Sequence, residues 1–332
     1  MWKSVHYEER GRSHVATGTP CQDKTLSLRK HGVDVIALAD GAGSAQYSHY
    51  GAETVIHTAA DYISENFATI ANNPDGRQVK LELLDVLQLA LAQKKEQLQC
   101  ELKDLASTLL LVAVYEHRFI MLHIGDGVIG YIKEDVLKVA SSPENGEFAN
   151  TTTFVTSSNA ALAMKLFKGK IDGIAGFVLM SDGTAESLYH KQSNSLVPAL
   201  LKIIHRNSII SRQRMYALVE ESFHNVIIPN TIDDCSIAIL SRTIGSLTEF
   251  EYMSTLQKCE FLQINPIGKS SLKRIKRYDR ILVELKQPKT EDEISRVLRL
   301  KRQYASRHLQ RLLDAGLILQ QDGTYRTTNV KL

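Results

Sequence analysis

The sequence predicts an α+β fold in which strands pair into a β-sandwich and helices come in blocks, followed by a small helical domain. Three observations carry this prediction: five short apolar runs, two long amphipathic segments between the first and second runs, and a change to basic, helix-compatible sequence near residue 270. At 332 residues and 43% hydrophobic content, the chain is long enough for one large domain and one small one.

The five apolar runs are rich in Val, Ile, Leu and Phe, and most are bounded by Gly, Asp or Ser, which is typical of buried strands. They cover residues 33–40, 107–116, 118–133, 176–183 and 233–241. We expect these runs to be the strands of the sandwich.

Helices are expected between these runs. Residues 50–67 and 79–102 repeat apolar positions at intervals of three and four, and residues 197–226 form a further helical region before the last run. Because these helices come in blocks, the order favours a sandwich over a regular alternation of strand and helix.

Residues 140–159 lack periodicity and are rich in Ser, Thr and Asn, which indicates a surface excursion. Long loops in compact domains are usually functional lids or disordered segments. Phe148 and Phe154 would give this one apolar anchors, so we expect a flap over about residues 140–170.

After residue 242 the strand signals stop, and residues 243–269 pass through Pro266 and Gly268 into basic sequence. We expect this segment to be a linker. It separates a large domain, residues 1–242, from a small one, residues 270–332.

The small domain has helical periodicity over residues 271–287, 290–300 and 302–318. Thr290 and Glu293 have the spacing of a capping box, and Asp322-Gly323 lies between two short strand-compatible runs, which predicts a hairpin. Three helices followed by a hairpin are typical of the winged helix-turn-helix, and residues 291–318 resemble the bacterial winged-helix regulators.

The net charge of +3 hides an asymmetry. Residues 269–332 hold 16 Lys/Arg against 7 Asp/Glu, which leaves 24 against 30 in the rest of the chain. An acidic front suits cation binding, whereas a basic tail suits nucleic acid or an acidic partner.

The four cysteines are scattered without a Cys-x-x-Cys pair, which argues against a disulfide framework or a structural zinc site. No apolar run approaches the roughly 18 residues of a membrane span. We therefore expect a cytoplasmic protein with no membrane partner.

Four aspartates lie at the ends of apolar runs: Asp40, Asp126, Asp182 and Asp233. One such Asp is most simply a turn residue, but four carboxylates gathered at one end of a sheet repel each other unless cations lie between them. Oxygen ligands favour magnesium or manganese, and two such ions can activate a water for attack on phosphorus. The residues alone therefore predict a two-metal hydrolase.

Five motifs resemble the PPM-type, or type-two-C, metal-dependent serine/threonine protein phosphatases, in their order and rough spacing. They are CQDKTLSL, IALADGAGSAQYSHYGAE, ASTLLLVAVYEHRFIMLHIGDGVIGYI, GFVLMSDGTAESL and NTIDDCSIAIL, all within residues 1–242. The segment PENGEFANTTTF resembles the flap of a bacterial branch of this family.

This resemblance implies a four-layer α/β/β/α sandwich with the metal site at one end. Asp40 would bridge both metals, the carbonyl of Gly41 would be a ligand, and Asp182 and Asp233 would complete the first metal site; these three aspartates are the predicted catalytic residues. Asp126 and Glu186 would hold a third, weaker metal.

The chain departs from the family pattern at three positions. The family's metal-side Glu is Gln22, which precedes Asp23; its phosphate-gripping Arg falls at Gly18; and its proposed proton donor is Ala42. Arg12 or His14 would have to reach the phosphate from a differently shaped loop. Gln22 and Asp23 remain in the predicted metal site, with one negative charge fewer.

In the small domain, the predicted partner-binding residues lie on the third helix. They are Lys301, Arg302, Gln303, Tyr304 and Arg307. Basic residues there would hold DNA phosphates and Gln303 would read a base edge, but winged helices also dock proteins, so both partners stay open.

The function predicted from the whole sequence is hydrolysis of phosphoserine and phosphothreonine in a protein substrate by a water activated by two Mn or Mg ions, with a possible third ion. The alternative is a pseudophosphatase that binds a phosphoprotein and acts as a regulator through the winged helix.

Overall fold

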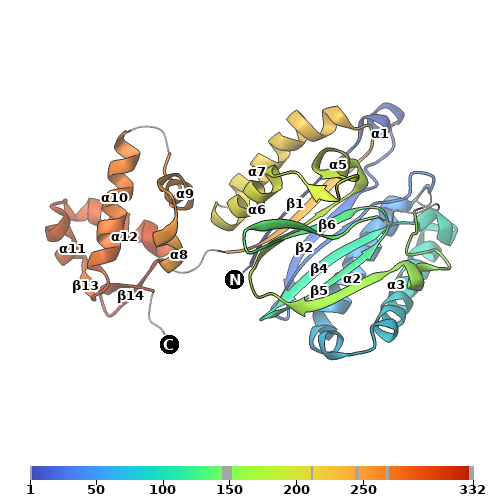
Figure 1. Cartoon of the computed structure of the whole chain (residues 1–332), viewed down its shortest axis with the longest axis horizontal. Coiled ribbons are helices and arrows are strands. Elements are labelled where there is room, and N and C mark those ends of the chain that lie inside the picture. Colours follow the sequence, from blue (N-terminus) through green and yellow to red (C-terminus); the bar gives the residue numbers. More distant parts are fainter. Residues whose placement is uncertain (1, 144–151, 211, 244–246, 266–268, 329–332) are drawn as a thin grey trace. The chain divides into compact units, whose positions relative to one another are not determined.

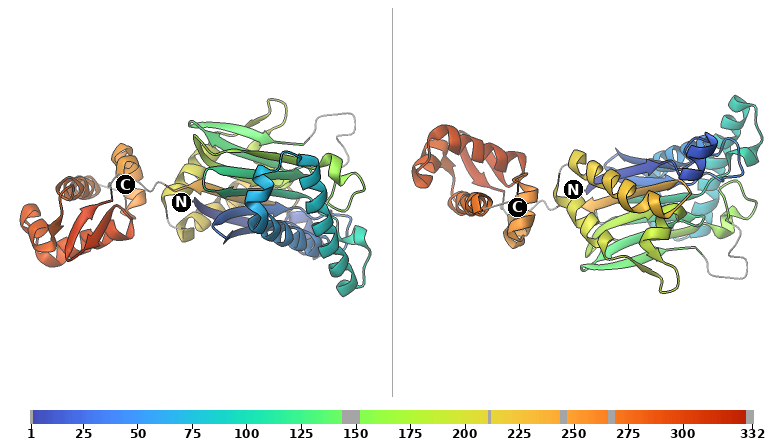
Figure 2. Two further views of the ribbon diagram at one scale, coloured as in Figure 1. Left: turned by 90° about the horizontal axis from the view of Figure 1, so that it is seen from below. Right: turned by 90° about the horizontal axis from the view of Figure 1, so that it is seen from above.

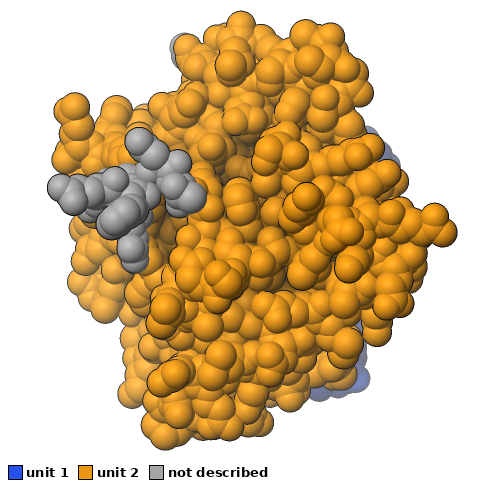
Figure 3. Space-filling view, turned by 90° about the vertical axis from the view of Figure 1, so that its right-hand side faces the viewer, with its two compact units in different colours: residues 1, 208–210, 243–332 blue, residues 2–207, 211–242 orange. Residues whose placement is uncertain are grey.

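The computed structural model describes residues 2–143, 152–210, 212–243, 247–265 and 269–328 (Figure 1). The chain divides into two compact units, coloured separately in Figure 3. The N-terminal unit comprises residues 2–207 and 211–242, and the C-terminal unit comprises residues 208–210 and 243–332.

Two five-stranded antiparallel sheets form the centre of the N-terminal unit. The first sheet has the order β1 (Trp2–Glu9), β12 (Cys235–Arg242), β9 (Ile174–Met180), β6 (Val128–Lys133) and β7 (Val136–Ser141). The second has the order β2 (Lys24–Lys30), β3 (Val33–Ala39), β4 (Leu109–Tyr115), β5 (Arg118–Ile124) and β8 (Lys165–Lys170).

Strand β3 shows how the sequence builds the layers, because its side chains alternate between two cores. Ile36 and Leu38 lie in the buried cluster between the sheets, with Phe177 and Leu240 of the first sheet. Val35 and the other odd-numbered residues of β3 lie in a second cluster against helices. Both faces are buried from Val35 onward, which is why β3 is apolar from Val35 to Ala39.

Helices cover both outer faces of the sandwich (Figures 1 and 2). The long helices α2 (Ser48–Asn72) and α3 (Gly76–Leu98) pack beside the second sheet. On the other side, α6 (Ala199–Ile209) and α7 (Arg212–Ser222) lie beside the first sheet. The predicted four-layer α/β/β/α sandwich is confirmed.

Shorter elements complete the N-terminal unit. They are α1 (Arg12–Thr17), η1 (Leu102–Leu105), α4 (Ala160–Ala163), α5 (Asp182–Leu188), β10 (Tyr189–His190), β11 (Ser195–Leu196), η2 (Phe223–Ile227) and η3 (Ile228–Asn230).

The five apolar runs correspond to the six interior strands, because residues 118–133 contain both β5 and β6. The four strands that the runs do not include, β1, β2, β7 and β8, are the four edges of the two sheets. Residues 140–170 were expected as a flap, but their last part, Lys165–Lys170, is strand β8, so the prediction is wrong for those residues.

The segment expected as a linker differs from the prediction. Residues 243–269 include α8 (Leu247–Tyr252) and α9 (Thr255–Phe261), and they belong to the C-terminal unit. Ser254 and Gln257 form a capping box at α9, and Phe250 and Cys259 are buried. These helices are short and their apolar residues few, which is why the sequence signal was weak.

The rest of the C-terminal unit has three helices and a small sheet. The helices are α10 (Lys269–Glu284), α11 (Glu291–Leu298) and α12 (Arg302–Asp314), and the strands are β13 (Lys289–Thr290), β14 (Ile318–Gln321) and β15 (Thr324–Thr327). The β14–β15 hairpin turns at Asp322-Gly323. Thr290 caps α11 reciprocally with Glu293, which confirms the predicted capping box. The unit thus has the three expected helices and the hairpin, and also β13 between α10 and α11, which pairs with β15; the winged-helix assignment stays a prediction.

A search of the described helices for an apolar stretch long enough to cross a bilayer finds none.

Candidate active site

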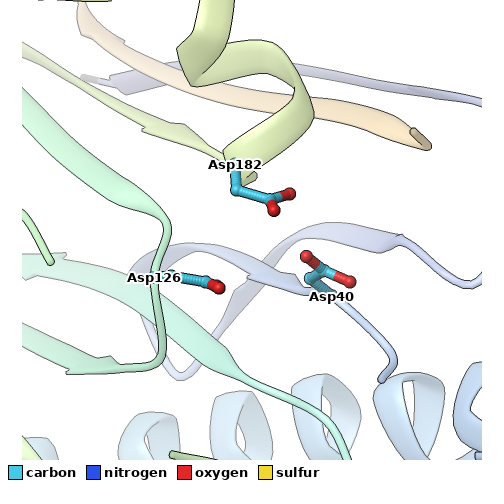
Figure 4. A group of neighbouring side chains, drawn as sticks. All are labelled: Asp40, Asp126 and Asp182. Carbon is cyan, nitrogen blue, oxygen red and sulfur yellow. The ribbon is translucent and has the colours of Figure 1, made fainter. Parts of the chain in front are cut away.

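Three of the predicted aspartates converge at one end of the sandwich (Figure 4). Asp40 directly follows β3, Asp182 begins α5 after β9, and Asp126 lies between β5 and β6. One carboxylate oxygen from each lies within 4.8 Å of the others. The group therefore combines residues that are far apart in the sequence and that come from both sheets.

Asp126 lies where the chain crosses from the second sheet to the first, since β5 and β6 belong to different sheets. Gly125 has a φ of +119°, and a Cβ there would lie 2.4 Å from Thr108 Cγ2, so only glycine fits the crossing. The Gly-Asp-Gly sequence thus makes the crossing and places the carboxylate at its apex.

A pocket of about 150 Å³ contains this group. Its lining residues are His14, Gln22, Asp40, Gly41, Ala42, Gly43, Asp126, Thr152, Phe154, Asp182, Asp233 and Asp234. Five of these are aspartates, and no lysine or arginine of the described residues lines the pocket. The fourth predicted aspartate, Asp233, is therefore at the same site.

Two of the crowded carboxyls, those of Asp40 and Asp182, have raised pKa values. Burial, then the nearby charges of Asp23 and Asp182, raises the pKa of Asp40 well above its ordinary value. Burial and then the charge of Asp126 raise the pKa of Asp182 to about 6. No lysine or arginine among the described lining residues offsets this repulsion.

The donor set fits a hard divalent cation. All of the crowded donors are oxygens, the chemistry that magnesium and manganese prefer. Moreover, Asp126 Oδ1 and Gln22 Oε1 are buried without a hydrogen-bond partner in the described part of the chain. Buried acceptors left unpaired are costly, and a cation or its water would satisfy both.

Gln22 and Asp23 lie at different depths. Gln22 lines the pocket, with its Nε2 donating to the carbonyl of Ala45. Asp23 is 1% exposed and does not line the pocket; burial raises its pKa to about 8, although the nearby hydroxyls of Ser236 and Ser181 act to lower it. Asp23 is placed behind Asp40, whose pKa it raises.

Gly41 is constrained by close packing. A Cβ on Gly41 would lie 2.8 Å from Ser48 and 2.9 Å from the carbonyl of Gln22, so a side chain would push these segments apart. The neighbouring Asp40 is bonded to the residue before β4, because its N–H donates to Thr108 Oγ1 and its carbonyl accepts from Thr108 N, both at 2.8 Å.

The two residues predicted for phosphate binding separate in the structure. His14 lines the pocket, whereas Arg12 is turned away and donates from Nε to the carbonyl of Thr231 at 2.9 Å. Gly18 ends α1 with a φ of +74°, and a Cβ there would meet no atom within 4 Å.

Glu186, predicted with Asp126 for a third metal, is exposed on α5 and is not a lining residue. It lies one helical turn beyond Asp182, which carries it along the helix axis and away from the acidic group.

The expected flap contributes to the pocket through its later part. Thr152 Oγ1 donates to Asp126 Oδ2 at 2.5 Å, and Phe154 packs against Ala42, Ala45 and Ala106. The other predicted anchor, Phe148, lies outside the described residues.

Sequence reasoning missed Asp234. This residue is 3% exposed, and its carboxylate accepts from Gly11 N at 2.7 Å and from Gln22 N at 2.6 Å. It also lies 2.9 Å from His14 Nδ1. The Asp-Asp pair in the last motif was the only signal of it.

In the C-terminal unit, all five predicted partner-binding residues are exposed at the start of α12. Arg302 lies 3.3 Å from Glu291 and 3.5 Å from Asp292, so its charge is partly offset. Arg307 lies over the ring of Tyr304 at 5.9 Å.

The sequence matches the profile of the protein phosphatase 2C family over residues 10–219, which is more than half of the chain. The chain belongs to the protein phosphatase 2C family. This confirms the resemblance drawn from the motifs and the predicted enzyme class, a serine/threonine protein phosphatase.

A curated relative of this phosphatase is serine/threonine-protein phosphatase 3 of Escherichia coli strain K12. The two are 26% identical over 202 residues, which cover 58% of this chain and 78% of the relative.

Solved structures share the fold of the phosphatase. A bacterial serine phosphatase has a TM-score of 0.51 at 12% identity, covering 73% of this chain and 98% of its own. The S. agalactiae serine/threonine phosphatase has a TM-score of 0.50 at 16% identity, covering 73% and 99%. The catalytic domain of PstP, solved with 2 manganese ions, has a TM-score of 0.50 at 14% identity, covering 73% and 98%. At these identities the likeness establishes the fold.

Proposed function

We propose that the N-terminal unit hydrolyses phosphoserine and phosphothreonine in a protein substrate, with two manganese or magnesium ions held in the acidic pocket. One observation carries the proposal: Asp40, Asp126 and Asp182 bring oxygens within 4.8 Å of one another in a pocket lined by no described lysine or arginine. The PstP structure, with its two manganese ions, supports the choice of metal.

The assignment of ligands follows the family pattern. By that pattern, Asp40 and the carbonyl of Gly41 would hold both ions, and Asp182 and Asp233 would hold the first. Gln22 would hold the second, with Asp23 behind the pocket wall. Asp126 would hold a third ion, and Glu186, which is exposed one turn away and outside the pocket lining, would reach that ion only through a water.

When bound, the two ions lower the pKa of a water and offset the charge on the phosphoryl group. The chain's own residues supply the rest. The aspartates fix the positions of those charges before the substrate arrives, and Phe154 with Ala42 and Ala106 forms an apolar wall that excludes bulk water. The phosphate meets one basic lining side chain among the described residues, His14.

Hydrolysis of an aryl phosphate with and without manganese tests this function. Because Asp182 is a ligand in the proposal, Asp182→Asn should lower manganese-dependent turnover at least about 100-fold. Asp172→Asn, an exposed aspartate in the turn before β9, is the matched control and should behave as the wild type. Unchanged turnover in Asp182→Asn would refute the assignment.

A second function, phosphoprotein binding without turnover, is favoured by two positions. Gln22 removes one negative charge from the second metal, and Gly18 offers no side chain to a phosphate. Wild-type protein in excess manganese that binds a phosphopeptide saturably, but releases no phosphate, would establish this alternative.

For the C-terminal unit we propose nucleic acid as the partner of α12. Lys301, Gln303 and Arg307 are exposed together at the start of this helix, and neither Lys301 nor Arg307 has an ion-pair partner among the described residues. The excess of basic residues in this part of the chain supports an anionic partner.

Salt titration of the full chain on duplex DNA tests this partner. Lys301→Ala with Arg307→Ala should weaken binding and reduce the slope of log affinity against log salt by about 2, one per phosphate contact. The control is Lys273→Ala with Lys286→Ala, which removes the same charge elsewhere in the unit. This control should bind DNA more tightly than the variant of Lys301 and Arg307. If the wild type fails to bind DNA at low salt, the partner of α12 is a protein.

A further inference from the structure

Release of a serine or threonine from phosphorus requires a proton. The departing alkoxide is far more basic than the phenolate of an aryl phosphate, since a phenol ionises near pH 10 and an alcohol near the pKa of water. A general acid that delivers a proton as the bond breaks therefore matters for the protein substrate and little for an aryl phosphate.

The pocket offers few groups that can deliver this proton. Ala42 has no proton to give, and four of the five lining aspartates are assigned to cations in the proposed function. The fifth, Asp234, is buried and occupied by the N–H groups of Gly11 and Gln22. Among the described lining residues, His14 is then the remaining titratable side chain.

The chain holds His14 in place by fastening the start of α1 to the loop before β12. Ser13 donates from N at 3.0 Å and from Oγ at 2.7 Å to the carbonyl of Ile232. A Cβ on Gly11 would lie 2.2 Å from the carbonyl carbon of Asp233, so the two segments touch backbone to backbone. The short helix that carries His14 is thus held against the segment that carries Asp233.

Asp234 also orients the imidazole. Its Oδ1 lies 2.9 Å from His14 Nδ1, an ion-pair distance without the alignment of a hydrogen bond. The other ring nitrogen, Nε2, has no hydrogen-bond partner in the described part of the chain. The side chain is 16% exposed, so it is held at the pocket wall and still reaches solvent.

We propose that His14 is the proton donor to the serine or threonine oxygen that leaves phosphorus, with Asp234 as its positioning residue; this rests on the proposed hydrolysis. Water attacks phosphorus, the bond from phosphorus to the substrate oxygen breaks, and the Nε2–H of the imidazolium gives its proton to that oxygen. The attacking water loses one proton to solvent and His14 regains one from solvent. One water is consumed, and one alcohol and one phosphate are released.

Comparison of two substrates in excess manganese tests the proposal. His14→Gln should lower kcat on a phosphoserine peptide on the order of 100-fold and kcat on p-nitrophenyl phosphate by less than about threefold, because only the first leaving group needs the proton. Asp234→Asn should show the same preference with a smaller loss. Val15→Gln, which changes an exposed residue of the same helix, is the control.

Other outcomes are distinguishable. Equal losses on both substrates would show that His14 binds phosphate or supports the fold, and an unchanged peptide kcat would show that it is not needed; either overturns the proposal. Calorimetric titration with manganese gives a readout apart from turnover: His14→Gln should keep the wild-type affinity, and a large loss would place its role at the cations. A wild type inactive on both substrates would refute the hydrolysis itself.

Discussion

At the scale of single residues, Asp233 and Asp234 show where the sequence was informative and where it was not. Both lie in the loop before β12, and the pattern of carboxylates at strand ends predicted a role for Asp233. The second is the buried one that accepts two backbone N–H groups and lies beside His14. The two aspartates are adjacent and of one type, so they differ only in where their side chains point. The positions of Gly11 and Gln22 in the fold decide this, and the local sequence does not show those positions.

Arg12 and His14 make the same point. Either could reach the pocket from the sequence, and Arg12 carries the stronger charge. The Arg12 guanidinium donates to the carbonyl of Thr231. Two residues later on the same short helix, the imidazole of His14 lines the pocket. A contact between residues more than 200 positions apart decides between them.

His123 predicts a pH dependence of stability. It is 1% exposed, with Nε2 3.0 Å from the carbonyl of Gly125 and Nδ1 2.6 Å from Ser141 Oγ. Because the carbonyl only accepts, Nε2 carries the proton and the hydroxyl of Ser141 donates to Nδ1. Burial lowers the pKa of His123 to about 4.

In the unfolded chain this histidine takes up its proton near pH 6.5, whereas in the folded protein it stays neutral until about pH 4. Stability is therefore complete above pH 6.5 and is lost as pH falls toward 4. Between pH 7.5 and 4.5 the wild type should lose roughly 2 to 3 kcal/mol more than His123→Gln, measured by urea unfolding of both proteins. Parallel pH profiles would contradict this account.

At the scale of elements, burial decides which strands the sequence reveals. The six interior strands are apolar on both faces, and each was visible as a run. Edge strands need fewer apolar residues: β1 buries only Val5 and Tyr7, and β8 reads Lys-Leu-Phe-Lys-Gly-Lys. Polar edges also hinder pairing with other chains. The polar residues that protect an edge strand from such pairing also leave it without the apolar run by which the interior strands were predicted.

The crossing at Gly125 was concealed for a different reason. Residues 118–133 read as one apolar stretch, yet β5 and β6 belong to different sheets. Gly-Asp-Gly was recognised as a turn with a carboxylate, but sheet membership depends on pairing partners, here β4 and β8 for β5 and β9 and β7 for β6. Local sequence carries no direct record of such partners.

Two glycines in helices should respond oppositely to the same substitution. A Cβ on Gly51 of α2 would lie 2.0 Å from the carbonyl oxygen of Leu105, whereas at Gly76 of α3 the nearest atom is 3.7 Å away. Alanine favours helix by up to about 1 kcal/mol in each case, but the clash at Gly51 costs more. By urea unfolding, Gly51→Ala should lose about 2 kcal/mol and Gly76→Ala should gain a few tenths to about 1. Equal changes would show that α2 is free to move away from η1.

At the scale of the whole molecule, the asymmetry of charge follows the division into units. The acidic front contains the carboxylate pocket, and the basic tail contains α12. The composition predicted a change after residue 242, but the segment that was expected there as a linker contains α8 and α9 of the C-terminal unit. A location in the cytoplasm stays a prediction.

Manganese should stabilise one unit and not the other. In calorimetry, manganese at about 100 times its dissociation constant adds roughly 2.7 kcal/mol to whichever unit binds it. For a unit of this size that raises the melting temperature by about 5 to 10 °C. The transition of the N-terminal unit should shift, and that of the C-terminal unit should stay.

Asp182→Asn is the control for this experiment. Without metal it should show the same two melting transitions as the wild type, and with manganese it should lose most of the rise in melting temperature. A shift of both transitions, or of the basic unit alone, would place the metal site elsewhere.

The pocket takes Asp40 from one sheet and Asp182 from the other, and the buried material between those sheets is the dry cluster around Phe177 and Leu240. The distances between the acidic oxygens therefore depend on how the two sheets are stacked. A substitution in that cluster that shifts one sheet against the other would therefore change the spacing of the acidic oxygens, although it lies remote from any substrate.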